Sequence, residues 1–352
     1  YAPTTAQVAG TPLLLISSQV NKFYIADLAP DRSMVEFTTA QGLPTFAISW
    51  RNPEREQADW GFATYMAACK EAVDAVLAIS GAERLHLAGI CGGGIMVSML
   101  LAHLAATDDE RVASGTLMVT HLDQAVQTLA SVLVADPVIA AAKRRSRRAG
   151  ILDGRDTARF FAWLRPNELV WSYVVNNWLL GDDPPQHELL FWNVDNTRLP
   201  AQLHVDYLDL YLKNALVHPG ALEVLGTPID LSAVRTDTYL VGGTTDHITP
   251  WRGCHRSAAL LGGDSQFVLS VGGHVGTIVS AIGNQRARHF AGPVTGDDPD
   301  AWSAAAEEHA GSWWPHWAAW LGERSAPPRR AARRLGNRRF PALESAPGSY
   351  VL

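Results

Sequence analysis

The stretch Gly89-Ile90-Cys91-Gly92-Gly93 limits most strongly how this chain can fold. An apolar run, Leu85–Ile90, leads into it, and apolar residues follow it at helical spacing (Met96, Met99, Leu100, Leu101 and Leu104). This change of period predicts a buried strand that turns directly into a helix. Glycines on both sides of Cys91 suit such a tight turn, because a Cβ would clash where backbones pass closely. The pattern is typical of a turn that presents a nucleophile, with cysteine where serine is usual.

The chemistry expected of Cys91 follows from its place at a helix start. A helix N-terminus favours negative charge, so it assists both a thiolate and an oxyanion that forms beside it. A thiol nucleophile points to thioester chemistry rather than to ordinary ester hydrolysis. The alternative interpretation is a buried structural cysteine in a glycine-rich turn, and the residues that could act together with Cys91 decide between the two.

Short apolar runs bounded by turn residues predict the buried strands of a sheet. They lie at Leu13–Ile16, Thr45–Trp50, Leu85–Ile90, Gly115–Val119, Thr238–Val241 and Phe267–Val271. Helical patterns alternate with the first four of them, at Ser33–Gln41, Tyr65–Ile79 and Gly93–Ala106. Together with the nucleophile turn, this alternation predicts an α/β-hydrolase fold, which is a mostly parallel sheet with helices on both faces.

The alternation stops after Val119 and resumes at Thr238. The intervening stretch is too long for a loop in a compact domain. It contains helical patterns near Leu122–Ala142, Thr157–Trp163, Asn167–Leu180 and Ala201–Asn214. We therefore expect residues 1–121 and 236–352 to form the core with a C-terminal tail, and residues 122–235 to form an inserted helical cap. Such a cap excludes water and shapes a substrate channel. A further helix is expected near Asp300–Trp320.

Composition excludes several classes of function. The formal net charge of −6 over 352 residues argues against general nucleic-acid binding. The three cysteines (Cys69, Cys91 and Cys254) suggest a reducing compartment without disulfides, and Cys69 and Cys254 are interpreted as structural. No clustered His and Cys spacing suggests a metal site, and no apolar run of about 18 residues or more suggests a transmembrane segment.

Two polar residues stand where partners of Cys91 are needed. In this fold the nucleophile, the acid and the histidine follow one another along the chain. Asp246 lies in the loop after Thr238–Val241, and His274 follows Phe267–Val271, which we interpret as the last strand. Both lie at the carboxyl ends of strands, where open α/β sheets place their sites. We expect His274 to take the Cys91 proton and Asp246 to orient His274. Taken singly, the acid could be a turn former and the histidine a loop residue, but their joint placement favours catalysis.

An acyl-transfer site also needs two N–H groups that receive the oxyanion. Gly92, the residue after the nucleophile, is expected to supply one of them. Val20, in the loop after Leu13–Ile16, is expected to supply the other, with Asn21 in a supporting role. His247 is next to the acid and is also given a supporting role.

Tryptophans and arginines gather in groups that have two interpretations each. The tryptophan groups are Trp163, Trp171, Trp178 and Trp192, and Trp313, Trp314, Trp317 and Trp320. Core packing is the simpler interpretation, and an apolar surface or tunnel for a greasy substrate is the other. The basic groups are Lys143, Arg144, Arg145, Arg147 and Arg148, and Arg329, Arg330, Arg333, Arg334, Arg338 and Arg339. Such runs usually form solvated faces, and the alternative is phosphate contact or docking to an anionic surface.

With these residues placed, the chain resembles the catalytic domain of polyhydroxyalkanoate synthases, the polyester polymerases of storage granules, from about Thr11 to Trp320. The matching stretches are Val20–Tyr24, Ser49–Pro53, the Cys91 turn, Leu164–Trp171, Leu190–Asn193, Asp246–Trp251, Gly273–His274 and Gly311–Trp314. Ser49–Pro53, Glu71–Ile79 and Leu222–Leu231 look more like single-subunit synthases that favour medium-chain monomers. Two positions depart from the pattern: Gly92 replaces a residue with a side chain, and Ser17-Ser18 replaces two prolines that are frequent there.

The resemblance implies a reaction and its partners. Cys91 would attack the thioester of an (R)-3-hydroxyacyl-coenzyme A, release coenzyme A and extend a growing polyester, without a metal or a further cofactor. Asp246 would support His274 or help to activate the 3-hydroxyl. The resemblance also implies a homodimer in the cytoplasm, at the granule surface, with granule-associated proteins as partners.

Three other functions are weighed against this one. A dienelactone-type cysteine hydrolase shares the turn around Cys91 but lacks a cap of this size. A thioesterase or polyester depolymerase would use water in place of the hydroxyl acceptor, and the sequence does not separate it from a synthase. A non-catalytic granule coat protein is disfavoured by the intact set of Cys91, Asp246 and His274.

Overall fold

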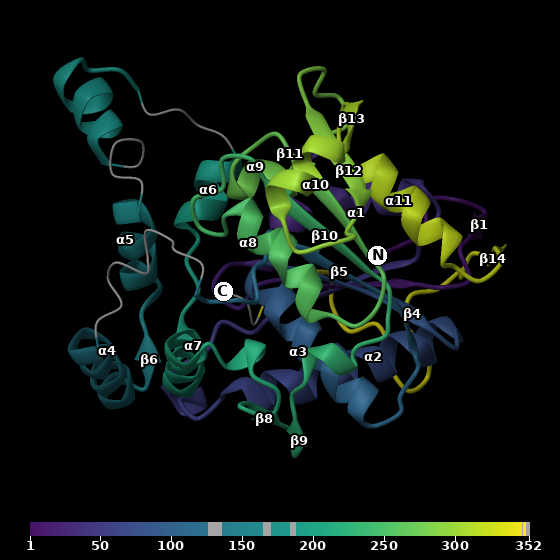
Figure 1. Cartoon of the computed structure of the whole chain (residues 1–352), viewed down its shortest axis with the longest axis horizontal. Helices are drawn as coiled ribbons and strands as arrows, with labels where there is room; N and C mark the ends of the chain where they lie inside the picture. The colour runs from purple at the N-terminus through teal and green to yellow at the C-terminus, as the bar shows by residue number, and fades with distance from the viewer. Residues whose placement is uncertain (126–135, 165–169, 184–187, 347, 350–352) are drawn as a thin grey trace.

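A mostly parallel sheet forms the centre of the computed structural model, which describes residues 1–352 except 126–135, 165–169, 184–187, 347 and 350–352 (Figure 1). Its eight strands have the order β13-β12-β11-β10-β5-β4-β2-β3. All pairs from β3 to β11 are parallel, whereas β12 and β13 are antiparallel to their neighbours. The strands are β2 (Leu13–Ile16), β3 (Thr45–Ile48), β4 (Leu85–Ile90), β5 (Val112–Met118), β10 (Thr238–Gly243), β11 (Ser265–Ser270), β12 (Arg288–Pro293) and β13 (Glu307–Ala310).

Helices cover both faces of this sheet. Side chains of one strand alternate between the faces, so Leu14 packs in one hydrophobic cluster and Leu15 in another. The first cluster includes residues of α2 (Phe62–Ser80) and α3 (Gly92–Ala106), and the second includes residues of α1 (Met34–Ala40) and α11 (Trp314–Glu323). The predicted fold class is therefore confirmed.

Two expectations about the C-terminal part are wrong. The strand before His274 is not the last, because β12 and β13 follow it. The single helix expected near Asp300–Trp320 is divided into α10 (Pro299–Ala305) and α11, with β13 between them. The physical reason is pairing with β12: Glu307–Ala310 is a polar edge strand without the apolar run by which buried strands are found.

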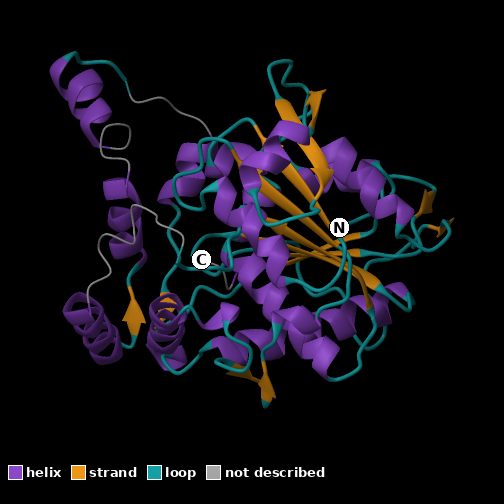
Figure 2. Cartoon of the chain, in the orientation of Figure 1, coloured by secondary structure: helices purple, strands orange, loops and turns teal. Residues whose placement is uncertain are grey.

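Mostly helical elements lie between β5 and β10, and in Figure 2 they stand beside the sheet. The expected helices near Thr157–Trp163 and Ala201–Asn214 are confirmed. Residues 122–125 are not helical, which contradicts the start of the expected helix Leu122–Ala142. Parts of that helix and of Asn167–Leu180 lie outside the described residues. The elements are α4 (Asp136–Ala149), β6 (Ile151–Leu152), α5 (Gly154–Leu164), a π-helix (Val174–Leu179), α6 (Glu188–Val194), β7 (Leu199–Pro200), α7 (Ala201–Lys213), β8 (Glu223–Val224) and β9 (Thr227–Pro228).

The remaining elements include a pair of short strands and two short helices. Strand β1 (Gln7–Val8) pairs with β14 (Arg329–Arg330), which brings a segment near the N-terminus beside the C-terminal tail. Helices α8 (Trp251–Arg256) and α9 (His274–Ile278) follow β10 and β11. In the parts of the chain that the structure describes, no helix is both long and apolar enough to cross a membrane.

The tryptophan groups divide between the two interpretations. Trp192 and the C-terminal group are buried, and Trp313, Trp314 and Trp317 are among the largest fully buried side chains. By contrast, Trp163, Trp171 and Trp178 are exposed, so this part of the chain presents apolar surface.

The start of α3 lies so close to the end of β2 that Gly93 has no room for a side chain. A Cβ built there overlaps the carbonyl oxygen of Ile16. We expect Gly93→Ala to lower the free energy of unfolding by about 3–5 kcal/mol, because backbone must move to admit the methyl group. Chemical denaturation measures this, with Gly322→Ala as control, since Gly322 lies in α11 with nothing near its missing Cβ. Equal stability of the two variants would contradict the prediction.

Candidate active site

Cys91 occupies the strained turn between β4 and α3. Its backbone angles are φ 53° and ψ −117°, a conformation that non-glycine residues rarely adopt. Its N–H donates to the Met118 carbonyl oxygen at 2.9 Å. Its carbonyl oxygen accepts from the Gly94 N–H at 2.8 Å and the Thr120 hydroxyl at 3.0 Å. These bonds hold the strained residue in place at the end of β4.

The structure brings Cys91, His274 and Asp246 together as a hydrogen-bonded triad. His274 Nδ1 and Asp246 Oδ2 are 2.7 Å apart, and the Cys91 side chain hydrogen-bonds His274. The Asp246 side chain is fully buried, whereas that of His274 is 10% exposed. Asp246 is fixed by the N–H groups of Ile248 and Thr249, at 2.8 and 2.9 Å, and by the Thr249 hydroxyl, at 2.7 Å. The acid is therefore held in a single orientation toward the histidine.

Electrostatic interactions within this triad favour the charged form of the His274 imidazole. Burial alone would lower the pKa of His274, but the charges of Asp246 and Cys91 and the hydrogen bonds to both raise it to about 10. Burial would likewise raise the pKa of Asp246, yet His274 and the hydrogen bonds from Thr249 lower it. An imidazole of this basicity can take a proton from a thiol, whose ordinary pKa is about 8.5.

The two expected oxyanion donors lie at the start of α3 and in the loop after β2. The N–H of Gly92 belongs to the first turn of α3, where no preceding turn can accept it. The N–H of Val20 donates to the Ser18 hydroxyl at 3.2 Å. An acyl oxygen would therefore have to replace Ser18 Oγ as the acceptor of this donor.

A tyrosine and a glutamine that sequence reasoning missed lie beside Gly92. Tyr207 of α7 is buried and donates from its hydroxyl to Gln19 Oε1 at 2.8 Å. Burial and the neighbouring Cys91 raise the pKa of Tyr207, which keeps the phenol protonated. A Cβ on Gly92 would lie 2.9 Å from both the Tyr207 and the Ser18 hydroxyl oxygens. Two departures from the family pattern, Gly92 and Ser18, thus lie against each other.

We expect Gly92→Ala to slow acylation about ten- to hundredfold, because the methyl group displaces groups beside the expected oxyanion donors, where shifts of about 1 Å are costly. The triple variant with Ser18→Ala and Tyr207→Phe removes both hydroxyls that the methyl group meets, and it should recover most of the rate. Burst kinetics with an acyl thioester measures this. An equally slow triple variant would show that the contacts at Gly92 are not the cause.

The supporting residues have different surroundings. Asn21 forms an isolated antiparallel bridge with Asn196, between the loop after β2 and the end of α6. Next to it, Lys22 pairs with Asp195 at 3.7 Å, and Tyr24 donates to the same carboxylate at 2.8 Å. The loop that carries Val20 is therefore tied to the inserted segment, which could not be foreseen from local sequence.

The structure also places His247 and the other two cysteines. His247 is half-buried on the loop of Asp246, and its supporting role stays a prediction. Cys69 and Cys254 are buried, and burial raises the pKa of both thiols, to about 12 for Cys69. Within the described ranges, no group of three or more His, Cys, Asp or Glu side chains is arranged to hold a metal ion.

The fold and the nucleophile turn define the class of the protein: the chain belongs to the alpha/beta hydrolase fold family, whose model matches residues 24–281. A second model, described as "Poly-beta-hydroxybutyrate polymerase (PhaC) N-terminus", matches residues 1–38. A soluble variant of monoglyceride lipase from Saccharomyces cerevisiae shares the fold, with a TM-score of 0.53, 12% identity and coverage of 93% of this chain and 91% of that one.

The resemblance to polyhydroxyalkanoate synthases is confirmed by curated relatives. Poly(3-hydroxyalkanoate) polymerase 1 of Ectopseudomonas oleovorans is 48% identical over 100% of this chain and 63% of its own length. Poly(3-hydroxyalkanoate) polymerase subunit PhaC of Cupriavidus necator is 39% identical over 100% of this chain and 61% of its own length. The chain therefore spans less than two thirds of the length of these relatives.

Proposed function

We propose that this chain carries the active site of a polyester synthase, which polymerises (R)-3-hydroxyacyl-coenzyme A and releases coenzyme A. The observation that carries the proposal is the hydrogen-bonded triad of Cys91, His274 and Asp246, whose members follow the carboxyl ends of β4, β11 and β10. It is supported by similarity to polyhydroxyalkanoate polymerases along the whole chain.

The proposed reaction begins with acylation of Cys91. The thiol proton goes to His274, and the sulfur attacks the thioester carbonyl while Gly92 and Val20 donate to the oxyanion. The carbon–sulfur bond to coenzyme A breaks, and the leaving thiolate takes the proton from His274. Asp246 holds His274 in place and stabilises its charged form.

Chain extension follows from the reactivity of the acyl-enzyme. Exchange of one thioester for another is nearly balanced in energy, so the acyl group on Cys91 stays reactive toward an alcohol. The 3-hydroxyl of a second acyl unit gives its proton to a base, and its oxygen attacks the thioester carbonyl to form an ester. The carbon–sulfur bond to Cys91 breaks, and the released thiolate takes the proton back from the base. His274 and Asp246 are the proposed bases, and either residue suits this role.

The proposal extends to the surroundings of the site. Residues 122–235 are proposed as a cap over the core formed by residues 1–121 and 236–352, and the burial of Tyr207 beside Gly92 supports this. We also propose that the chain forms a homodimer at the surface of a cytoplasmic polyester granule. We further propose that it prefers medium-chain monomers and needs no further cofactor. The exposed apolar side chains Trp163, Trp178 and Phe191 support a partner surface in this cap. Light scattering tests the dimer.

The deciding experiment mixes the chain with (R)-3-hydroxyacyl-coenzyme A of short and medium chain length, follows free thiol release and analyses the product. Thiol release with insoluble polyester supports the synthase and ranks the monomers. Thiol release with only free hydroxy acid would instead identify a thioesterase or another hydrolase, and absence of release from all substrates would contradict an acyl-transfer enzyme.

A further inference from the structure

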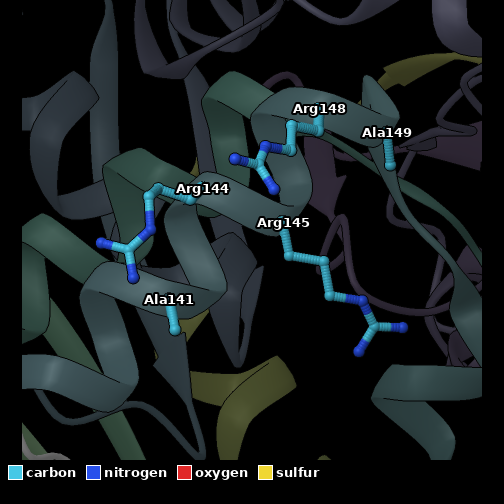
Figure 3. A pocket seen from close by; sticks show the side chains of 5 residues that line it. All are labelled: Ala141, Arg144, Arg145, Arg148 and Ala149. Carbon is cyan, nitrogen blue, oxygen red and sulfur yellow. The ribbon is translucent and has the colours of Figure 1, made fainter.

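Two polar features outside the triad differ in their exposure to water. Figure 3 shows the first, an open groove on α4 that is lined by Ala141, Arg144, Arg145, Arg148 and Ala149. Its three arginines are exposed, whereas Lys143 and Ser146, on the opposite side of the same helix, contact α7. This placement favours a solvated face as the interpretation of this basic group. The second feature is the buried side chain of Gln19, which lies beside the nucleophile turn.

The side-chain nitrogen of Gln19 is a hydrogen-bond donor without an acceptor. Gln19 lies in the loop after β2 and is 1% exposed. Its Oε1 accepts from the Tyr207 hydroxyl at 2.8 Å, so Nε2 is the end of the amide that does not face this hydroxyl. Nε2 is buried and has no hydrogen-bond partner among the residues that the structure describes. A buried donor in this state costs about 1–3 kcal/mol, and a catalytic role is one reason why a native protein carries such a cost.

The amide group of Gln19 lies next to the first residue of α3. A Cβ built on Gly92 would be 3.5 Å from Gln19 Oε1 and 2.9 Å from the Tyr207 hydroxyl oxygen. Because Nε2 is bonded to the same carbon as Oε1, it also lies close to Gly92. Gly92 directly follows the nucleophile, and its N–H is an expected oxyanion donor. The unpartnered nitrogen is therefore close to the place where the acyl oxygen is expected to become charged.

The loop after β2 holds two donors that differ in their readiness. The N–H of Val20 already donates to the Ser18 hydroxyl at 3.2 Å, so it must exchange one acceptor for another. The neighbouring Gln19 Nε2 breaks no hydrogen bond to the described part of the chain when it receives an acceptor. A fixed donor of this kind stabilises a developing negative charge without a cost of reorganisation.

We propose that Gln19 donates from Nε2 to the acyl oxygen during acylation of Cys91, as a third oxyanion donor beside Gly92 and Val20. The inference rests on the proposed function and deepens it by naming a further catalytic residue. As the Cys91 sulfur bonds to the carbonyl carbon, one electron pair moves from the carbonyl bond onto the oxygen, where Nε2 donates to it. The pair returns when the carbon–sulfur bond to coenzyme A breaks, and the leaving thiolate takes its proton from His274. The amide itself gives up no proton.

The test is Gln19→Met, which keeps the approximate size of the side chain and removes its donor. Acylation of Cys91 by an (R)-3-hydroxyacyl-coenzyme A, followed in single turnovers, should slow about 10²-fold, as for the loss of one oxyanion donor. Alkylation of Cys91 by iodoacetamide forms no oxyanion, so its rate should not change. The matched control is Gln202→Met, because Gln202 of α7 donates to Asp206 at 2.6 Å, and this variant should keep both rates.

Comparison of the two reactions separates catalysis from a structural effect. Slower acylation with unchanged alkylation, in Gln19→Met but not in Gln202→Met, supports the inference. Unchanged acylation in Gln19→Met would overturn it. An equal decrease of both rates would also overturn it, because it would give Gln19 a purely structural role.

An aldehyde distinguishes failure of this inference from failure of the proposed function. 3-Hydroxybutanal adds to a thiolate without coenzyme A: the sulfur bonds to the carbonyl carbon, and the oxygen takes the electron pair and then a proton. Protection of Cys91 from iodoacetamide measures this addition. If thioesters do not acylate the unaltered chain, the proposed function fails, and the aldehyde decides the role of Gln19 alone. An affinity about tenfold weaker in Gln19→Met supports the inference, and equal protection of both proteins, or protection of neither, overturns it.

Discussion

Replacing Cys91 by alanine is expected to abolish thiol release from (R)-3-hydroxyacyl-coenzyme A, with a loss of at least about 10⁴-fold in kcat. The residue is the nucleophile of the proposed reaction, and neither His274 nor Asp246 can form the acyl-enzyme in its place. Mass spectrometry after a short incubation should show one acyl group on the unaltered chain and none on Cys91→Ala. The fold should persist, because alanine needs less space in the turn than cysteine.

The other two cysteines provide matched controls for this experiment. Cys254→Ala and Cys69→Ala remove buried thiols whose raised pKa values keep them protonated. Both variants should keep their acyl group and lose only about 1 kcal/mol of stability through the small cavity. Polymer formation by Cys91→Ala at an undiminished rate would eliminate the covalent mechanism.

The parts of the site that the sequence predicts are those with a local signal. The glycines around Cys91 mark the turn because a Cβ there overlaps neighbouring backbone, as at Gly93. Asp246 and His274 could be placed because each directly follows an apolar strand, and parallel strands bring their carboxyl ends to one edge. The distances between them are then set by the sheet, which is why the structure brings the three residues together.

The parts that the sequence does not predict depend on distant contacts. Tyr207 meets Gln19 although 188 positions separate them, and no local pattern indicates such a pairing. Strand β13 is polar and pairs only at the sheet edge, so its residues carry no local signal for a strand. Trp163 and Trp178 have the same composition signal as Trp313, yet they are exposed, because composition does not state which tryptophans the tertiary fold covers.

Several contacts connect the inserted segment to the loop after β2. Asp195, at the end of α6, holds both Lys22 and Tyr24, while Trp192 donates to the Lys22 carbonyl oxygen at 2.9 Å. The same loop carries Val20, the expected second oxyanion donor. A movement of this segment would therefore also move Val20, so the proposed cap and the proposed oxyanion donor are linked by the same contacts.

Replacing His274 by glutamine is expected to slow acylation of Cys91 by about 10³-fold or more and to change its pH dependence. In the unaltered chain His274 stays charged across neutral pH, since its pKa is raised to about 10. Because a neighbouring positive charge favours a thiolate, alkylation of Cys91 by iodoacetamide should depend less on pH in the unaltered chain than in the variant. In the His274→Gln variant the rate should rise steeply with pH, as for an ordinary thiol, whose pKa is about 8.5.

The same substitution should change how stability depends on pH. The pKa of His274 lies above the unfolded value of about 6.5, so its stabilising contribution is complete below that pH and is lost as pH rises toward 10. The melting temperature of the unaltered chain should thus fall between pH 7 and 10 more than that of His274→Gln. His218→Gln, at an exposed position, serves as control, and His247→Gln tests whether the adjacent histidine is the base. If His247→Gln rather than His274→Gln produced the steep alkylation profile, the assignment of the base would have to move to His247.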